Sequence, residues 1–227
     1  MINQIADVNL SSRRCIIFDY DGTLADTKPT IVSTASKVLL EWGVPADEVA
    51  SKVDQLVGPP FPQAFCQIFG MSCEDADEVT RRYRAIYRMS GPEAWPFFTG
   101  TRELLSQLRE SGKLVAIASS KPQHLIDRGL EDNHVVDLFD AAVGSRPDEV
   151  STKQDAIRLV LQELGCAPEE AVMVGDRFHD VEGAETCGIP CAGVLWGDTG
   201  TREELECAGA AAVVDTVDEL ARVLSGR

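Results

Sequence analysis

The stretch that decides the fold reads Cys15-Ile16-Ile17-Phe18-Asp19-Tyr20-Asp21-Gly22-Thr23. Its first half is a short apolar run typical of a buried parallel strand, and its second half is acidic and reaches a glycine. Because side chains two positions apart on an extended chain project to the same face, we expect Asp19 and Asp21 to share a small volume at the strand's carboxyl end. Two carboxylates held so close repel each other, which indicates a metal site or an acid/base pair. The alternative is an Asp-Gly turn with both carboxylates in solvent.

The rest of the chain divides, by its hydrophobic pattern, into a helical part and an alternating part. Residues 1–12 are polar and are predicted to be a loose leader. Residues 28–96 show only helical periods, whereas strand and helix patterns alternate from residue 97 onward. We therefore predict an α/β fold with a doubly wound, mostly parallel, Rossmann-like core sheet built from residues 1–27 and 97–227. Residues 28–96 are predicted to be an inserted all-helical subdomain.

Polar residues also follow the second predicted strand, at the edge of the sheet where such folds bind ligands. Ser119 and Ser120 come after the apolar run 114–118 and just before a predicted helix, whose free amides favour an anion. Capping of that helix by Ser120 is the alternative. Lys153 begins another helix, where its charge opposes the helix dipole unless a phosphate lies nearby. An ordinary solvated lysine is the alternative for this residue.

Two more carboxylates follow the apolar run 171–174. If a helix begins directly after this strand, Asp176 and Asp180 lie one turn apart and can face the same edge of the sheet. The alternative for Asp180 is a helix cap. The predicted edge therefore collects four carboxylates, a serine and a lysine, and chance placement explains this set poorly.

The composition restricts the classes of partner. The 227 residues carry a formal net charge of −16, which disfavours nucleic acid and anionic membrane surfaces as partners. No apolar run approaches the ~18–20 residues of a membrane span, and the amino terminus lacks a signal-peptide pattern, so we predict a cytoplasmic protein. The seven cysteines include no C-x-x-C pair, so the spacing typical of a zinc site is absent.

In order and spacing, these polar residues resemble the four motifs of the haloacid dehalogenase superfamily of phosphatases. The matching residues are Asp19-x-Asp21-Gly22-Thr23, Ser119, Lys153 and Gly175-Asp176-x-x-x-Asp180. The helical insertion at residues 28–96 resembles the C1 cap of the phosphoglycolate phosphatase-like members. Three stretches also resemble that subgroup: Val57-Gly58-Pro59-Pro60, Gly175-Asp176-Arg177-x-His179-Asp180 and Gly193-Val194-Leu195-Trp196-Gly197. The resemblance covers residues 14–224.

The resemblance implies a role for each matching residue. Asp19 is implied as the nucleophile that forms an aspartyl phosphate, and Asp21 as the general acid for the leaving alkoxide and then the base for water. The implied ligands of Mg²⁺ are the Asp19 carboxylate, the Asp21 main-chain carbonyl, Asp176 and Asp180. The implied phosphate-binding residues are Ser119, Lys153, Gly22, Thr23 and Ser120. Arg177 departs from the family pattern, because many members have a small polar residue there.

The function implied by the resemblance is a Mg²⁺-dependent phosphatase for a small phosphorylated metabolite, with phosphoglycolate or a nucleoside 5′-monophosphate as first candidates. A sugar-phosphate phosphotransferase, similar to a phosphoglucomutase, shares every core residue and stays open. A catalytically silent binder of a phosphorylated ligand is the least favoured alternative. Arg81, Arg84 and Arg88 share a helix face that either binds a second anionic group of the substrate or is solvated. The sequence does not distinguish a monomer from a homodimer.

Overall fold

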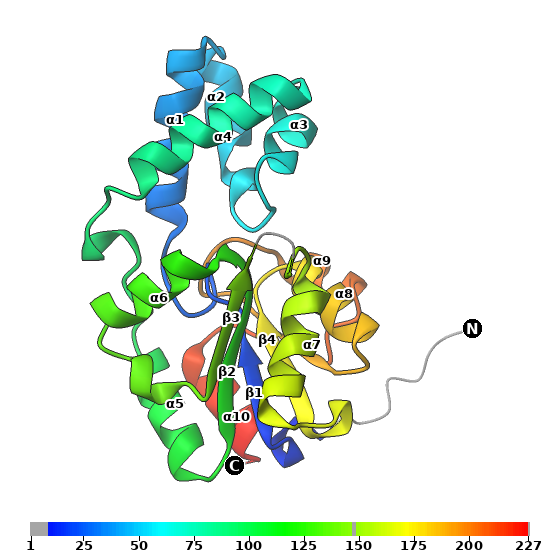
Figure 1. Cartoon of the computed structure of the whole chain (residues 1–227). Helices are drawn as coiled ribbons and strands as arrows, with labels where there is room; N and C mark the ends of the chain where they lie inside the picture. The colour runs from blue at the N-terminus through cyan, green and yellow to red at the C-terminus, as the bar shows by residue number, and fades with distance from the viewer. Residues whose placement is uncertain (1–8, 147–148, 227) are drawn as a thin grey trace.

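The chain forms a parallel sheet with the strand order β3-β2-β1-β4-β5-β6 (Figure 1). The computed structural model describes residues 9–146 and 149–226. All neighbouring strands in this sheet are parallel. The strands are β1 (Cys15–Phe18), β2 (Leu114–Pro122), β3 (Ala141–Ser145), β4 (Ala171–Gly175), β5 (Cys191–Val194) and β6 (Ala212–Val214). This order is that of a doubly wound Rossmann-like sheet, so the predicted fold class is confirmed.

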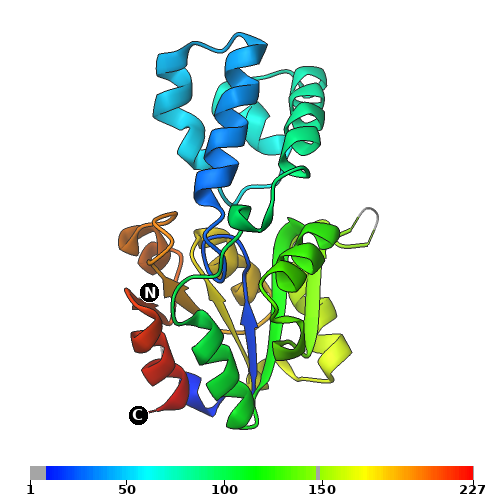
Figure 2. The same ribbon diagram turned by 90° about the vertical axis from the view of Figure 1, so that its left-hand side faces the viewer.

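Helices cover both faces of this sheet (Figure 2). They are α5 (Thr101–Glu110), α6 (Gln123–Asp132), α7 (Lys153–Leu164), α8 (Phe178–Thr186), α9 (Arg202–Cys207) and α10 (Val217–Ser225). Strand β1 is buried on both sides, because Ile17 packs in the core under α7 and α8 while Ile16 and Phe18 pack in the core under α5 and α10. This two-sided burial explains why the strand is apolar at every position.

A group of helices lies over the carboxyl ends of the strands, between β1 and α5 in the sequence (Figure 1). This group, here called the helical subdomain, contains α1 (Lys28–Trp42), α2 (Ala46–Lys52), α3 (Gln63–Phe69) and α4 (Cys73–Tyr87). Short 3₁₀ turns follow α2 (Val53–Leu56) and α4 (Pro92–Ala94). Within the described residues, none of the helices is both long enough and apolar enough to span a membrane.

Two chain segments connect the helical subdomain to the sheet, and they are hydrogen bonded to each other. The Asp26 amide donates to the Pro96 carbonyl at 2.8 Å, and the Phe98 amide donates to the Leu24 carbonyl at 3.0 Å. Trp95 is fully buried beside them and donates through Nε1 to Asp132 of α6 at 2.9 Å. The two connections therefore form one paired neck above the sheet.

Several element predictions differ from the structure. The prediction of a loose leader is wrong for residues 9–12, because Leu10 is buried and begins a 3₁₀ turn; residues 1–8 lie outside the described part of the chain. Within residues 28–96, where only helical periods are predicted, α2 ends at Lys52 and the chain continues as a 3₁₀ turn. The strand predicted to end at Ala118 continues, with a shift in register, to Pro122.

Candidate active site

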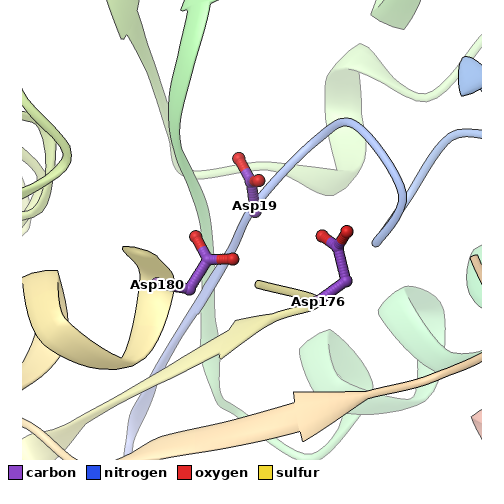
Figure 3. A group of neighbouring side chains, drawn as sticks. All are labelled: Asp19, Asp176 and Asp180. Atoms are coloured by element: carbon purple, nitrogen blue, oxygen red, sulfur yellow. The ribbon is translucent and has the colours of Figure 1, made fainter. Parts of the chain in front are cut away.

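The centre of the candidate site lies where the two middle strands end. Asp19 follows β1 and is hydrogen bonded through its amide to Val174 of β4, at 2.8 Å. Asp176 follows β4, and Asp180 lies in the first turn of α8. One carboxylate oxygen from each of these three aspartates lies within 4.8 Å of the others, and Figure 3 shows the three side chains next to one another. The crevice outside the carboxyl ends of such a sheet is its usual ligand site.

Two glycines make this close approach of carboxylates sterically possible. A Cβ atom on Gly175 would lie 2.3 Å from Cγ of Asp180, and one on Gly22 would lie 2.4 Å from Oδ2 of Asp176. Gly22 also has a φ of +76°, a conformation that side-chain-bearing residues rarely adopt. Any larger residue at these positions would push the carboxylates apart.

Asp176 is the most enclosed member of the group. Its oxygens accept hydrogen bonds from Thr23 Oγ1 at 2.7 Å and from Thr199 Oγ1. Burial raises the pKa of Asp176 to about 8, and the negative charges of Asp180 and Asp19 act in the same direction. The local structure therefore opposes ionisation of this carboxyl group unless a further positive charge is nearby.

Asp180 and Asp19 share the ammonium group of Lys153. Lys153 Nζ lies 2.7 Å from Asp19 Oδ1 and 2.8 Å from Asp180 Oδ1. Burial alone would lower the pKa of Lys153, but the carboxylates of Asp180 and Asp19 outweigh burial and raise it. Burial raises the pKa of Asp180 to about 6, against the opposing effect of Lys153. This lysine is charged and buried.

Capping interactions fix the positions of both helix residues. Thr152 caps α7 by accepting from the Asp155 amide at 3.2 Å, and Lys153 is the first helical residue, as the sequence predicts. Asp180 is the third residue of α8, and its Oδ2 accepts from the Arg177 amide at 3.1 Å. Asp180 was expected either to face the edge of the sheet or to cap the helix. It does both, because one carboxylate oxygen accepts from the Arg177 amide at the helix start and the other contacts Lys153.

The group fits a hard divalent cation. Its ligand atoms are carboxylate oxygens, which suit Mg²⁺, and all three aspartates are buried close to one another. Among the described residues, no hydrogen-bond donor reaches Asp19 Oδ1 or Asp180 Oδ1 with good geometry, although Lys153 lies at ion-pair distance from both. Carboxylate oxygens that lack donors in a buried site are suited to a cation.

The carboxylates of Asp19 and Asp21, which the sequence predicts to share one small volume, contact different lysines. Strand β1 ends at Phe18, so the alternation of an extended chain does not continue through residue 21. Asp21 Oδ1 instead lies 2.8 Å from Lys121 Nζ and faces a cavity of about 550 Å³ between the helical subdomain and the sheet. Asp19 lines an adjoining cavity of about 350 Å³. The Asp21 carboxylate is not a member of the acidic group formed by Asp19, Asp176 and Asp180.

The predicted phosphate-binding residues lie near these cavities in different ways. Ser120 lines both of them, and Lys153 lines the one that contains Asp19. Ser119 is buried, and its Oγ accepts from the Lys121 amide at 3.3 Å. Gly22 and Thr23 contact Asp176 rather than either cavity. Capping of α6 by Ser120 does not occur, because Pro122 takes that position.

Sequence reasoning missed three residues that contact the predicted ones. Lys121 belongs to none of the motifs, yet its buried ammonium group pairs with Asp21 and donates to Tyr87 Oη at 3.2 Å. Thr199 donates to Asp176 from the loop between β5 and α9, and no motif in the sequence indicates this contact. Glu204 pairs with Arg177 at 2.9 Å, and no local pattern indicates this contact.

The sequence left open whether the arginine face of α4 binds a second anionic group of the substrate or is solvated, and the structure has features of both. Arg81, Arg84 and Arg88 all line the 550 Å³ cavity. Arg81 is also paired with Glu78 at 2.7 Å, as expected for a solvated face. The face is therefore exposed and borders the cavity at the same time.

Comparison with known proteins identifies the family. A family model described as haloacid dehalogenase-like hydrolase matches residues 16–194, which is most of the chain. The chain therefore belongs to the haloacid dehalogenase-like hydrolases, and the resemblance drawn from the four motifs is confirmed.

Individual relatives carry different names. A 5′-nucleotidase from Pseudomonas aeruginosa is 35% identical over 192 residues, which cover 84% of this chain and 86% of the relative. The tyrosine-protein kinase PtkA from Mycobacterium tuberculosis is 34% identical over 216 residues, which cover 94% of this chain and 73% of the relative. The structure of a predicted phosphatase from Clostridium acetobutylicum matches with a TM-score of 0.88 and 33% identity, over 96% of this chain and 100% of that one. Together with the family match, the relatives named 5′-nucleotidase and predicted phosphatase confirm the expected class, a phosphatase-type hydrolase.

Proposed function

We propose that this hydrolase is a Mg²⁺-dependent phosphatase that cleaves a small-molecule phosphate monoester through an aspartyl phosphate on Asp19. The observation that carries the proposal is the contact of Asp19 with Lys153 inside a buried carboxylate group that borders a cavity. We assign Asp19, Asp176, Asp180 and the main-chain carbonyl of Asp21 as the Mg²⁺ ligands. When bound, the ion supplies positive charge that attracts a phosphate dianion into a protein of net charge −16.

The proposed reaction has two displacements at phosphorus. In the first, a carboxylate oxygen of Asp19 attacks phosphorus, and the bond between phosphorus and the ester oxygen breaks. The ester oxygen takes the electron pair of that bond and a proton from the Asp21 carboxyl group, and it leaves as an alcohol. In the second, water attacks the phosphorus of the aspartyl phosphate, gives its proton to Asp21, and the bond to Asp19 breaks. Inorganic phosphate and the original carboxylate result.

The remaining predicted residues bind and orient the phosphoryl group in this proposal. Lys153 contacts its oxygens from the Asp19 side, where a fixed positive charge stabilises the charge that spreads over them in the transition state. Ser120, which lines both cavities, and Ser119 donate hydrogen bonds at the end of β2. Gly22 and Thr23 contact Asp176 and thereby keep the loop after β1 close to the phosphoryl group.

We propose that residues 28–96 act as a cap that excludes water during the reaction and contacts the leaving group. The cavity of about 550 Å³ under this subdomain has the size of a pocket for a drug-sized ligand. Phe61, Tyr83 and Tyr87 contribute aromatic rings to its wall. This lining favours a nucleoside 5′-monophosphate over phosphoglycolate, and the Pseudomonas aeruginosa relative named 5′-nucleotidase supports the same choice. We expect the enzyme to act on such metabolites in the cytoplasm.

Phosphate release from a panel of monoesters tests the proposal. The panel contains nucleoside 5′-monophosphates, phosphoglycolate, sugar phosphates and an aryl phosphate, each with Mg²⁺ or with EDTA. We expect metal-dependent release that Asp19→Asn lowers by several orders of magnitude, whereas the surface variant Asp137→Asn retains it. Release that survives both EDTA and Asp19→Asn would overturn the proposal.

A second set of reactions tests the phosphotransferase alternative, to which the relative named tyrosine-protein kinase gives weight. Activity that requires a sugar bisphosphate activator, or that transfers phosphate to an added alcohol in preference to water, would favour it. No release and no transfer with any substrate would favour a silent binding protein.

A further inference from the structure

Arg177 stands in the turn between Asp176 and Asp180, and its side chain leaves the carboxylate group to contact the helical subdomain. Its NH1 atom donates to the main-chain carbonyl of Val57 at 2.6 Å, across 120 positions of sequence. Only 15% of the Arg177 side chain is exposed, so this charge-assisted hydrogen bond is shielded from solvent. The bond joins the turn of two predicted metal ligands to the region that covers the site.

Glu204 of α9 holds Arg177 in this orientation. Glu204 Oε1 accepts from Arg177 Nε at 2.9 Å and from the Phe178 amide at 3.0 Å. The guanidinium group is therefore anchored to the sheet domain at one edge while NH1 reaches the subdomain. Lysine has no planar fork, so it cannot make both contacts in this geometry.

The segment that Arg177 contacts forms a wall of both cavities. Gly58 and Pro60 line the cavity of Asp19 as well as the cavity of Asp21. Gly58 has a φ of +106°, and a Cβ atom there would lie 3.3 Å from Arg177 NH1, so the two segments are in close contact. We call residues 57–61 the cap loop. Movement of the cap loop would open both cavities together.

A second polar contact between the helical subdomain and the sheet domain is more exposed to solvent than the contact of Arg177 with Val57. Lys28 Nζ lies 3.4 Å from Asp54 of the subdomain and 3.2 Å from Asp198 of the sheet domain, but the side chains of Asp54 and Asp198 are 64% and 98% exposed. Exposed ion pairs of this kind contribute little to stability. Of these two contacts, the shielded one of Arg177 is the stronger. Lys121 and Arg128 also donate to the helical subdomain, to Tyr87 Oη and to the Arg88 carbonyl, but neither contacts residues 57–61 there.

We propose that Arg177 is a positioning residue that holds the cap loop against the Asp176–Asp180 turn and thereby keeps both cavities closed around a bound monoester. The link between the segments stands on the geometry alone, whereas its effect on turnover rests on the proposed phosphatase function. Arg177 itself touches neither the phosphoryl group nor the leaving group in this account. Its loss is expected to weaken closure rather than the displacements at phosphorus.

The kinetic test compares Arg177→Met, Arg177→Lys and Glu204→Gln with the native enzyme. A hydrogen bond to a charged group in a shielded site favours closure about 10- to 100-fold, so we expect Arg177→Met to raise KM by a factor in that range while kcat changes less than about fivefold. Arg177→Lys should have a KM close to that of Arg177→Met. The KM of Glu204→Gln should lie between that of Arg177→Lys and that of the native enzyme. Arg202→Met removes an exposed arginine of the same helix as Glu204 and should change neither constant.

Hydrogen exchange of the peptide that contains the cap loop provides a readout that needs no substrate. We expect faster exchange at Gly58 and Phe61 in Arg177→Met and unchanged exchange in Arg202→Met. In the kinetic test, the Mg²⁺ concentration that gives half-maximal activity should not change. Unchanged exchange of the cap loop in Arg177→Met would overturn the proposal, as would a loss confined to kcat or to Mg²⁺ activation. If the native protein released no phosphate, the proposed function would fail while the exchange experiment still decided the role of Arg177.

Discussion

The raised pKa of Asp176 predicts how the stability of the metal-free protein changes with pH. This carboxyl group has a pKa of about 8 in the folded protein and an ordinary value of 3.8. Between these values the folded state holds a proton that the unfolded state has released, so stability falls as the pH rises. Each pH unit costs about 1.4 kcal/mol, so from pH 5 to pH 7 this group lowers the free energy of unfolding by about 3 kcal/mol.

Urea unfolding in EDTA at pH 5, 6 and 7 measures this effect. We expect Asp176→Asn to remove about 3 kcal/mol of the decrease seen in the native protein, because the amide does not titrate. Asp137→Asn removes an exposed carboxylate and should leave the decrease unchanged. Saturating Mg²⁺ should stabilise the native protein most at pH 7, since the ion binds the ionised carboxylates. An equal pH dependence for the native protein and Asp176→Asn would refute the reasoning.

Two further predictions concern the buried lysines. Lys153→Met leaves Asp19 and Asp180 without their cation. We therefore expect the free energy of unfolding, measured with urea, to fall by about 3–5 kcal/mol and the rate of phosphate release to fall at least ~100-fold. Native-like stability of this variant would contradict the ion pairs. Lys121→Met leaves Asp21 without its partner, so hydrolysis of an alkyl phosphate should slow more than that of an aryl phosphate, whose leaving group needs less protonation. Equal losses on the two substrates would argue against a link between Lys121 and the general acid.

Local patterns predicted the parts of the site that depend on neighbouring residues. Asp176 and Asp180 are brought together by a strand end and the first turn of the next helix, and both features are visible in the sequence. The position of Lys153 at the start of a helix was also predicted from the sequence, and α7 begins at this residue. The parallel orientation of the strands was predicted from the alternation of apolar runs and helical periods.

The contacts that the sequence did not reveal depend on where elements end and on which segments meet. Asp21 pairs with Lys121 and is not part of the carboxylate group of Asp19; β1 ends at Phe18, and a period of two gives no information beyond that point. Lys121 lies in the irregular end of β2, where the register shift decides the direction of the side chain. Arg177 reaches Val57 only because the helical subdomain folds back over the sheet.

Detection of the aspartyl phosphate tests the central claim most directly. The enzyme would be mixed with Mg²⁺ and its best monoester from the panel, quenched in acid within milliseconds, digested and analysed by mass spectrometry. The account predicts one phosphoryl group on the peptide that contains Asp19, at a level that rises and decays with turnover and is absent from Asp19→Asn. Turnover by the native enzyme with no phosphoryl group on Asp19 at any time, or with the label on another residue, would contradict it.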